Sequence, residues 1–119
     1  MSFDPLDFLT LAQSMASSGA QESELRTAVG RAYYALFLMA RDKMDVRRRN
    51  SVHHETIKRL KKTEGYRTMA DQLDELSRLR KVADYELTPI KPEHQNWPEN
   101  WSRASLLVDR IRPRLQQLK

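Results

Sequence analysis

Residues 23–44 carry the clearest helical signal in the chain, and they read SELRTAVGRAYYALFLMARDKM. Apolar side chains recur there every three or four residues, the spacing that keeps one stripe of an α-helix against a protein core. The pattern therefore predicts one long helix with a buried side. Its buried stripe is made of Leu25, Ala28, Val29, Ala32, Leu36 and Met39.

Similar patterns before and after this segment predict an all-α protein. Only three glycines are present, and no segment alternates apolar and polar residues over the length of a strand. Short connections between consecutive helices favour an antiparallel bundle of four to five helices, with residues 1–119 as a single domain. The further helices are expected over residues 5–17, 51–63, 66–87 and 99–118.

Local signals place the ends of these helices. Asp4 is an N-capping residue directly before a proline, and Ser51 is expected to cap the third helix. Gly65 closes that third helix. Three prolines make residues 88–98 a loop. Pro113 lacks a backbone donor, so we expect it to kink or break the last helix.

The composition excludes several classes of protein. The 119 residues include no cysteine, which rules out disulfide frameworks and cysteine-based zinc fingers. The first residues lack the basic and apolar regions of a signal peptide, and no apolar run approaches the roughly 20 residues of a membrane span. We therefore expect a cytoplasmic protein that has no membrane contact and uses no metal or other cofactor.

The positive charge is concentrated in the middle of the chain. The formal net charge is +5, and residues 41–62 hold nine Lys and Arg against three Asp and Glu. A local basic surface suits a polyanion such as RNA, or an acidic protein partner; a merely solvated helix face is the alternative. The candidate RNA-binding residues are Arg41, Arg47, Arg48, Arg49 and Lys58.

A charged pair interrupts the apolar side of the fourth predicted helix. Arg80 and Asp84 are four residues apart, so their side chains are neighbours on the helix surface. Such a pair either ties helices together or holds an arginine ready for phosphate, with Asp84 fixing its direction. Both alternatives are open at this point. The apolar residues on the same side are Met69, Leu73, Leu76, Leu79, Ala83 and Leu87.

The long second helix carries a further apolar feature outside its main stripe. Tyr34 and Leu38 lie one turn apart there, with Arg31 and Arg41 beside them. This surface suits either a contact between two copies of the chain or a platform on which a base stacks. The dimer is favoured, so Arg31, Tyr34 and Leu38 are the predicted dimer interface.

Two adjacent histidines open the third helix. His53 and His54 point about 100° apart on a helix, so they cannot easily bind one metal ion together. No second set of ligands at metal-binding spacing accompanies them. The sequence therefore predicts a helix-capping or surface role for both.

Two stretches of the chain resemble the HEPN family (higher eukaryotes and prokaryotes nucleotide-binding). Residues 31–37 read RAYYALF, similar to the family's Arg-Ala-Tyr-Tyr-Ala signature. Residues 79–85 read LRKVADY, similar to the Leu-Arg-x-x-Ala-Asp-Tyr signature of its short, single-domain branch. With the number of helices, the resemblance covers nearly the whole chain. It implies a HEPN-like antiparallel bundle that usually forms a homodimer.

The resemblance also implies which residues would act on RNA. Family ribonucleases cleave RNA without a metal, using an Arg and a His separated from it by four to six residues. Arg80 matches that Arg, but positions 85–87 hold Tyr85, Glu86 and Leu87 instead of a histidine. The candidate catalytic residues are therefore Arg80, Asp84 and Tyr85. In some relatives a nearby Tyr is adenylylated by a partner nucleotidyltransferase antitoxin, which makes Tyr85 a conceivable target.

Three functions follow from these features. The first is an RNA-directed HEPN protein, a metal-independent ribonuclease or toxin of a toxin–antitoxin or defence system. The second is a non-catalytic interaction module that dimerises and binds a nucleotidyltransferase-like partner. The third is a structural helical dimer with an internal ion pair. The missing histidine leaves open whether the chain is an enzyme.

Overall fold

The computed structural model describes residues 3–47 and 50–118, and within them it contains helices and no strand. The all-α prediction is confirmed. The second helix differs from its predicted range by a single residue at either end. The helices are α1 (Leu6–Met15), α2 (Glu22–Lys43), α3 (Val52–Lys62), α4 (Arg67–Tyr85), the short 3₁₀ helix η1 (Pro92–His94) and α5 (Trp97–Gln117).

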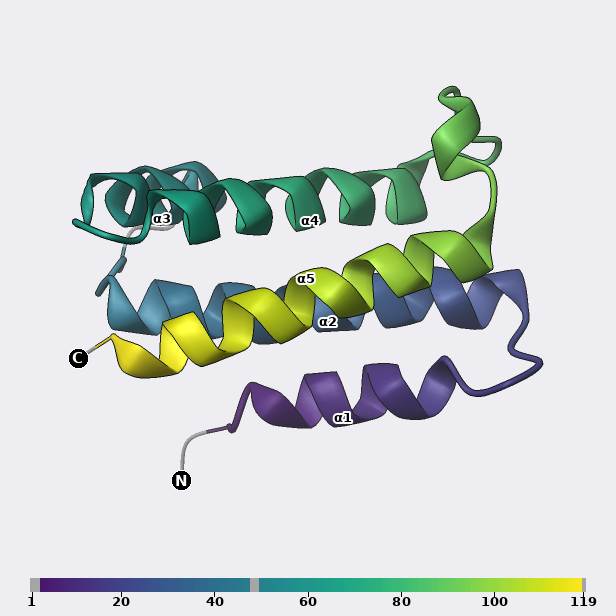
Figure 1. Ribbon diagram of the computed structural model, residues 1–119, viewed down its shortest axis with the longest axis horizontal. Coiled ribbons are helices and arrows are strands. Elements are labelled where there is room, and N and C mark those ends of the chain that lie inside the picture. The colour runs from purple at the N-terminus through teal and green to yellow at the C-terminus, as the bar shows by residue number, and fades with distance from the viewer. Residues whose placement is uncertain (1–2, 48–49, 119) are drawn as a thin grey trace.

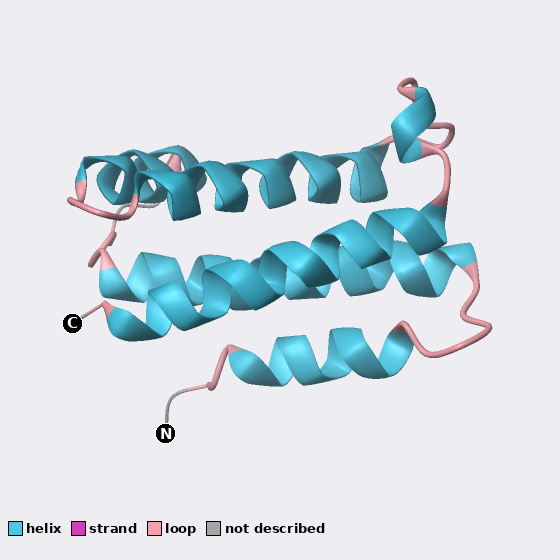
Figure 2. Cartoon of the chain, in the orientation of Figure 1, coloured by secondary structure: helices cyan, strands magenta, loops and turns pink. Residues whose placement is uncertain are grey.

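Helix α2 is the centre of the bundle and contacts each of the other four α-helices. Figure 1 shows α3 and α4 above α2 and α5, with α1 below them. The colours in Figure 1 show that α4 runs antiparallel to both α2 and α5. Loops join the helices only at the two ends of the bundle (Figure 2).

Alanines on α2 allow its neighbours to pack closely. Four of them are completely buried, and large aliphatic side chains from α4 and α5 fill the space around them. Truncating one of the buried leucines of α4 or α5 to alanine would cost about 2–5 kcal/mol of stability, because the surrounding helices fill the resulting cavity only in part. The residues at the centre of the core include Ala28, Ala32, Ala35, Ala40, Leu36, Leu73, Leu76, Leu107 and Ile111.

The helix ends follow the predicted signals only in part. The Asp4 carboxylate accepts a hydrogen bond of 3.0 Å from the Leu6 amide, as a capping residue does. Gly65 has φ of +84°, a conformation that glycine adopts without strain. Ser51 occupies the N-cap position of α3, but it has φ of +57° and its side chain makes no capping hydrogen bond. The predicted Ser51 cap is therefore wrong.

Two further expectations about helix ends differ from the structure. Pro113 does not break the last helix, and α5 continues through it to Gln117, because the buried Ile111 and Leu115 hold its last turns against the core. Helix α4 ends at Tyr85, so Leu87 lies beyond the apolar stripe and is 96% exposed. Within the part of the chain that the structure describes, no helix has the length and apolar character needed to cross a membrane.

Candidate functional site

Arg80 lies in the C-terminal half of α4 and points at the aromatic residues of α2. The residue is only 7% exposed, in agreement with its place on the apolar side of the helix. Its guanidinium carbon lies 5.4 Å from the ring centres of both Tyr33 and Tyr34. A guanidinium at this distance from an aromatic face is attracted by the ring electrons. Two tyrosines from one helix thus hold an arginine from another.

The hydrogen bonds of Arg80 are incomplete. Its Nη1 donates to the Asp84 Oδ2 at 3.2 Å, which confirms that the two residues pair. Its Nε is buried, and the described residues offer it no acceptor. The Asp84 side chain is 39% exposed, so this end of the pair reaches solvent. A guanidinium with an unused donor can still donate a hydrogen bond to an anionic oxygen.

His53 joins Arg80 through the same tyrosines. The His53 ring stacks on Phe37 with 4.0 Å between ring centres, and its Nδ1 lies 2.6 Å from the Tyr33 Oη. Tyr33 therefore contacts a histidine from α3 and an arginine from α4. We call the six residues that meet here the arginine–aromatic cluster: Tyr33, Tyr34, Phe37, His53, Arg80 and Asp84.

Burial and charge set the protonation states in this cluster. Burial raises the pKa of Tyr33 to about 12, against the opposing effects of Ser77 and Arg80, so its phenol keeps its proton. Burial lowers the pKa of His53, and the positive charges of Arg80, Lys81 and Arg41 lower it further. His53 is therefore a neutral imidazole at pH 7.

Arg80 itself stays charged at any physiological pH. Burial works against the charge, but the hydrogen bond with Asp84 and the nearby Tyr34 outweigh it, so the pKa of Arg80 is raised. The cluster thus combines a fixed cation with a neutral base.

The placement of His53 corrects the predicted capping or surface role. The ring is half-buried among aromatic side chains, and only His54 is exposed. A helical wheel of α3 contained the necessary signal. His53, Ile57 and Leu60 recur at intervals of four and three residues, so they share the side of α3 that faces the core. The two adjacent histidines differ because only one of them lies on that side.

The predicted dimer interface is partly occupied by α1. The Arg31 guanidinium carbon lies 5.0 Å from the ring centre of Phe8 on α1 and 5.3 Å from that of Tyr34. Leu38 is half-buried and lines a hollow of about 440 Å³ together with Phe3. These three residues of α2 therefore share a surface with α1, and Arg31 links its two aromatic rings.

The predicted RNA-binding residues are scattered. The Arg41 Nε donates to the Val46 carbonyl at 3.1 Å, which secures the end of α2. Arg47 is exposed and forms a 2.7 Å ion pair with Asp45. Lys58 is exposed on α3. The remaining two, Arg48 and Arg49, lie outside the described residues.

Tyr85 shares no contact with the arginine–aromatic cluster. The residue is 75% exposed, and no hydrogen bond or ring contact links it to other described residues. Of the three candidate catalytic residues, the structure therefore brings together Arg80 and Asp84, with His53 beside them. Tyr85 instead begins an exposed segment that includes Leu87 and Ile90.

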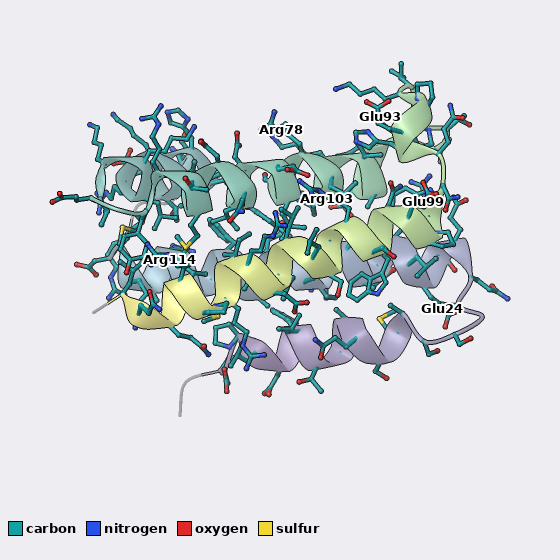
Figure 3. All side chains as sticks on the ribbon, in the orientation of Figure 1. Glu24, Arg78, Glu93, Glu99, Arg103 and Arg114 are labelled. Atoms are coloured by element: carbon teal, nitrogen blue, oxygen red, sulfur yellow. The ribbon has the colours of Figure 1, made fainter. Side chains whose placement is uncertain are left out.

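A more voluminous hollow lies elsewhere, between α4, η1 and α5. It measures about 670 Å³, and Figure 3 shows Arg78, Glu93, Glu99 and Arg103 around it. Arg103 is already engaged by Glu75 through hydrogen bonds of 2.6 and 2.7 Å. Acidic and basic groups alternate there, so this hollow favours no single ligand charge. Among residues 3–47 and 50–118, no group of three or more His, Asp and Glu side chains is placed to hold a metal ion.

Comparison of the chain with protein-family models, with curated proteins and with solved structures finds no match. The residues of the chain and the geometry of the arginine–aromatic cluster are therefore the basis on which its function is inferred.

Proposed function

We propose that this chain is an RNA-directed protein of the HEPN type that acts as a homodimer, and that it is a metal-independent ribonuclease or toxin. One observation carries the proposal. Arg80 is held on two tyrosine rings, its Nε has no acceptor among the described residues, and the Nδ1 of the neutral His53 lies 2.6 Å from the Tyr33 hydroxyl. His53 thus supplies, from α3, the histidine that positions 85–87 lack. The cluster combines the two chemical groups that such cleavage needs.

The proposed reaction is an internal phosphoryl transfer within RNA. His53 takes the proton of a ribose 2′-hydroxyl, and the resulting oxygen attacks the adjacent phosphorus. The bond from phosphorus to the 5′-oxygen breaks, giving a 2′,3′-cyclic phosphate and a free 5′-hydroxyl once that oxygen regains a proton. Arg80 stabilises the charge on the phosphate oxygens, and Asp84 keeps its guanidinium in place.

The tautomer of His53 decides whether it can act in this way. When Nδ1 donates its proton to the Tyr33 Oη, the opposite nitrogen, Nε2, has a free lone pair and serves as the base. When Tyr33 donates to Nδ1 instead, Nε2 carries the proton. The proposed chemistry uses the first tautomer, so Tyr33 is the residue that orients the base.

The direct test is cleavage of a 5′-labelled RNA by the purified chain in the presence of EDTA. We expect Arg80→Lys to lower the rate by about 10²-fold or more, because lysine keeps the charge but loses the planar fork that grips phosphate. Arg78→Lys, on the exposed side of the same helix, is the matched control and should cleave normally. Equal rates for both variants and the wild type would show that cleavage does not occur at Arg80.

One observation favours a second function, the non-catalytic interaction module. Tyr85, Leu87 and Ile90 expose large apolar side chains within six consecutive residues. Exposed apolar clusters of this kind mark contacts with other proteins, such as a second copy or a nucleotidyltransferase-like partner. Replacing Leu87 and Ile90 with serine should then shift sedimentation from dimer to monomer. An unchanged sedimentation coefficient would argue against a dimer contact through this segment.

A further inference from the structure

A groove of about 400 Å³ runs between α3 and the N-terminal half of α4. We call it the α3–α4 groove. Four of its side chains are Lys or Arg, one is acidic and one is apolar. The full lining is His54, Ile57, Lys58, Lys61, Lys62, Arg67 and Asp74.

Most of the positive charge in this groove is uncompensated. Within the described part of the chain, Lys58, Lys62 and Arg67 have no acidic partner. Lys61 lies 3.6 Å from an Asp71 oxygen. The single acidic residue of the lining, Asp74, is engaged by Arg78 at 3.1 Å. The groove therefore presents three free cations.

The helical register places these cations side by side. Lys58 and Lys62 are one turn apart on α3, while Ile57 and Leu60 occupy the side of the helix that packs on the core. Like charges four residues apart on a helix repel each other. An anion bound between them relieves this repulsion, and a chain of phosphates does so for every cation along the groove.

We propose that the α3–α4 groove binds the phosphate backbone of a single-stranded RNA and leads it to the arginine–aromatic cluster. In naming RNA, this inference rests on the proposed function. Two observations indicate that the regions are neighbours. Asp74 lines the groove, and its charge also acts on Tyr33 in the cluster. His54 lines the groove, and the preceding residue, His53, is part of the cluster.

The lining favours a nucleic acid over an acidic protein as the occupant. Protein interfaces gain most of their affinity from buried aromatic and aliphatic anchors at their centre. Ile57 is the only apolar side chain among those that line the groove. Lysine ammonium groups bind phosphates as point charges and need no apolar anchor.

The test compares two variants that each remove two positive charges. The first is Lys58→Gln with Lys62→Gln, in the groove. The matched control is Lys91→Gln with Arg110→Gln, since both of these residues are exposed and neither side chain forms a hydrogen bond or ion pair with another described residue. Binding of a fluorescein-labelled oligouridine is measured by anisotropy between about 50 and 200 mM salt, and binding of polyglutamate is measured alongside it.

We expect the groove variant to flatten the dependence of log affinity on log salt by about 1.4, because each contact to a single strand contributes about 0.7. Its affinity should fall on the order of tenfold at the lowest salt, while the control changes far less. Equal losses of affinity in both variants would show that RNA binding depends only on net charge. That result would overturn the proposed binding in the groove but would not contradict RNA cleavage at Arg80.

The polyglutamate arm tests the identity of the occupant. Equal affinity for polyglutamate and oligouridine, lost together in the groove variant, would assign the groove to an acidic protein and overturn the RNA path. Failure of the wild-type chain to bind oligouridine at the lowest salt would overturn both the groove and the proposed function. Loss of cleavage in Arg80→Lys with binding unchanged would support separate roles for the cluster and the groove.

Discussion

Two arginines lie between α2 and α4, and they differ greatly in how many of their hydrogen-bond donors have partners. Arg26, on α2, donates from its two terminal nitrogens to four backbone carbonyls at and beyond the end of α4, at 2.8–3.4 Å. Its Nε bonds Glu22 at 2.9 Å, and its guanidinium lies over the Trp97 ring at 4.4 Å. Arg80, on α4, has one carboxylate oxygen, two tyrosine faces and a buried Nε for which the described residues provide no acceptor. The four carbonyls belong to Val82, Ala83, Glu86 and Leu87.

The difference separates a structural arginine from one that has capacity for a ligand. The last carbonyls of a helix have no partner within it, and Arg26 supplies the missing donors at the end of α4. Each of its three nitrogens donates at least one hydrogen bond, so most of its donor capacity is used within the fold. Arg80 keeps an unused donor beside an aromatic surface, and burying such a donor costs stability. A fold selected for stability alone would favour an apolar side chain at position 80.

The largest effect on stability is expected from replacing Arg26 with methionine. Arg26→Met keeps a long side chain on Trp97 but removes the guanidinium that donates to the carbonyls at the end of α4. We expect a loss of about 2–3 kcal/mol, because hydrogen bonds from a charged group contribute more than neutral ones. For a chain of this size, that loss lowers the melting temperature by about 10 °C. An unchanged melting temperature would contradict the structural role of Arg26.

Arg80→Met should have a much smaller effect on stability. The substitution removes the buried, unpaired Nε, and Asp84 is left half in water, where its charge remains solvated. We expect a melting temperature within about 3 °C of the wild type, since removing one partner of an ion pair costs most when the other charge is left buried, and the Asp84 side chain is 39% exposed. RNA cleavage should nevertheless disappear. A loss of stability as large as that of Arg26→Met would show that Arg80 is mainly a tie between helices.

Sequence patterns predicted the features of this molecule that depend on residues close together in the sequence. The stripe of α2 and the Arg80–Asp84 pair follow from intervals of three and four residues, so the helical repeat was enough to find them. The hydrogen bonds from Arg26 to the end of α4 join residues that are 56 to 61 positions apart in the sequence, and the bond between Tyr33 and His53 joins residues 20 positions apart. No local periodicity encodes such distances, and only the packing of whole helices brings these groups together.

Pro113 shows the opposite failure, in which a local rule is overridden. A proline inside a helix removes one backbone hydrogen bond, and the sequence therefore predicted a kink or a break. The last two turns of α5 bury Ile111 and Leu115 completely. Burying two such side chains contributes roughly 3–6 kcal/mol, enough to offset the cost of about 3 kcal/mol for a proline inside a helix. Tertiary packing thus decides where α5 ends.

The smallest expected effect is on the titration of His53, and it separates the two arginines without any assay of function. Burial and the charges of Arg80, Lys81 and Arg41 lower the pKa of His53 below its ordinary value of about 6.5. The folded chain therefore binds fewer protons than the unfolded chain just below that pH. The contribution of neutral His53 to stability is complete above about pH 6.5 and is lost as the pH falls through the lowered pKa.

Removing the nearby charge should raise the pKa of His53 towards its ordinary value, because one of the repelling cations is gone. We therefore expect Arg80→Met to shift the NMR titration of the His53 ring to higher pH, whereas Arg26→Met leaves it unchanged. His53→Phe keeps the stacking on Phe37 and identifies the resonance by its absence. His53→Phe should also lose less stability than the wild type between pH 7 and pH 5, because it lacks the group whose pKa is lowered in the folded chain. Equal titrations in the wild type and Arg80→Met would show that the two side chains do not share one electrostatic site, and the joint role of Arg80 and His53 would then fail.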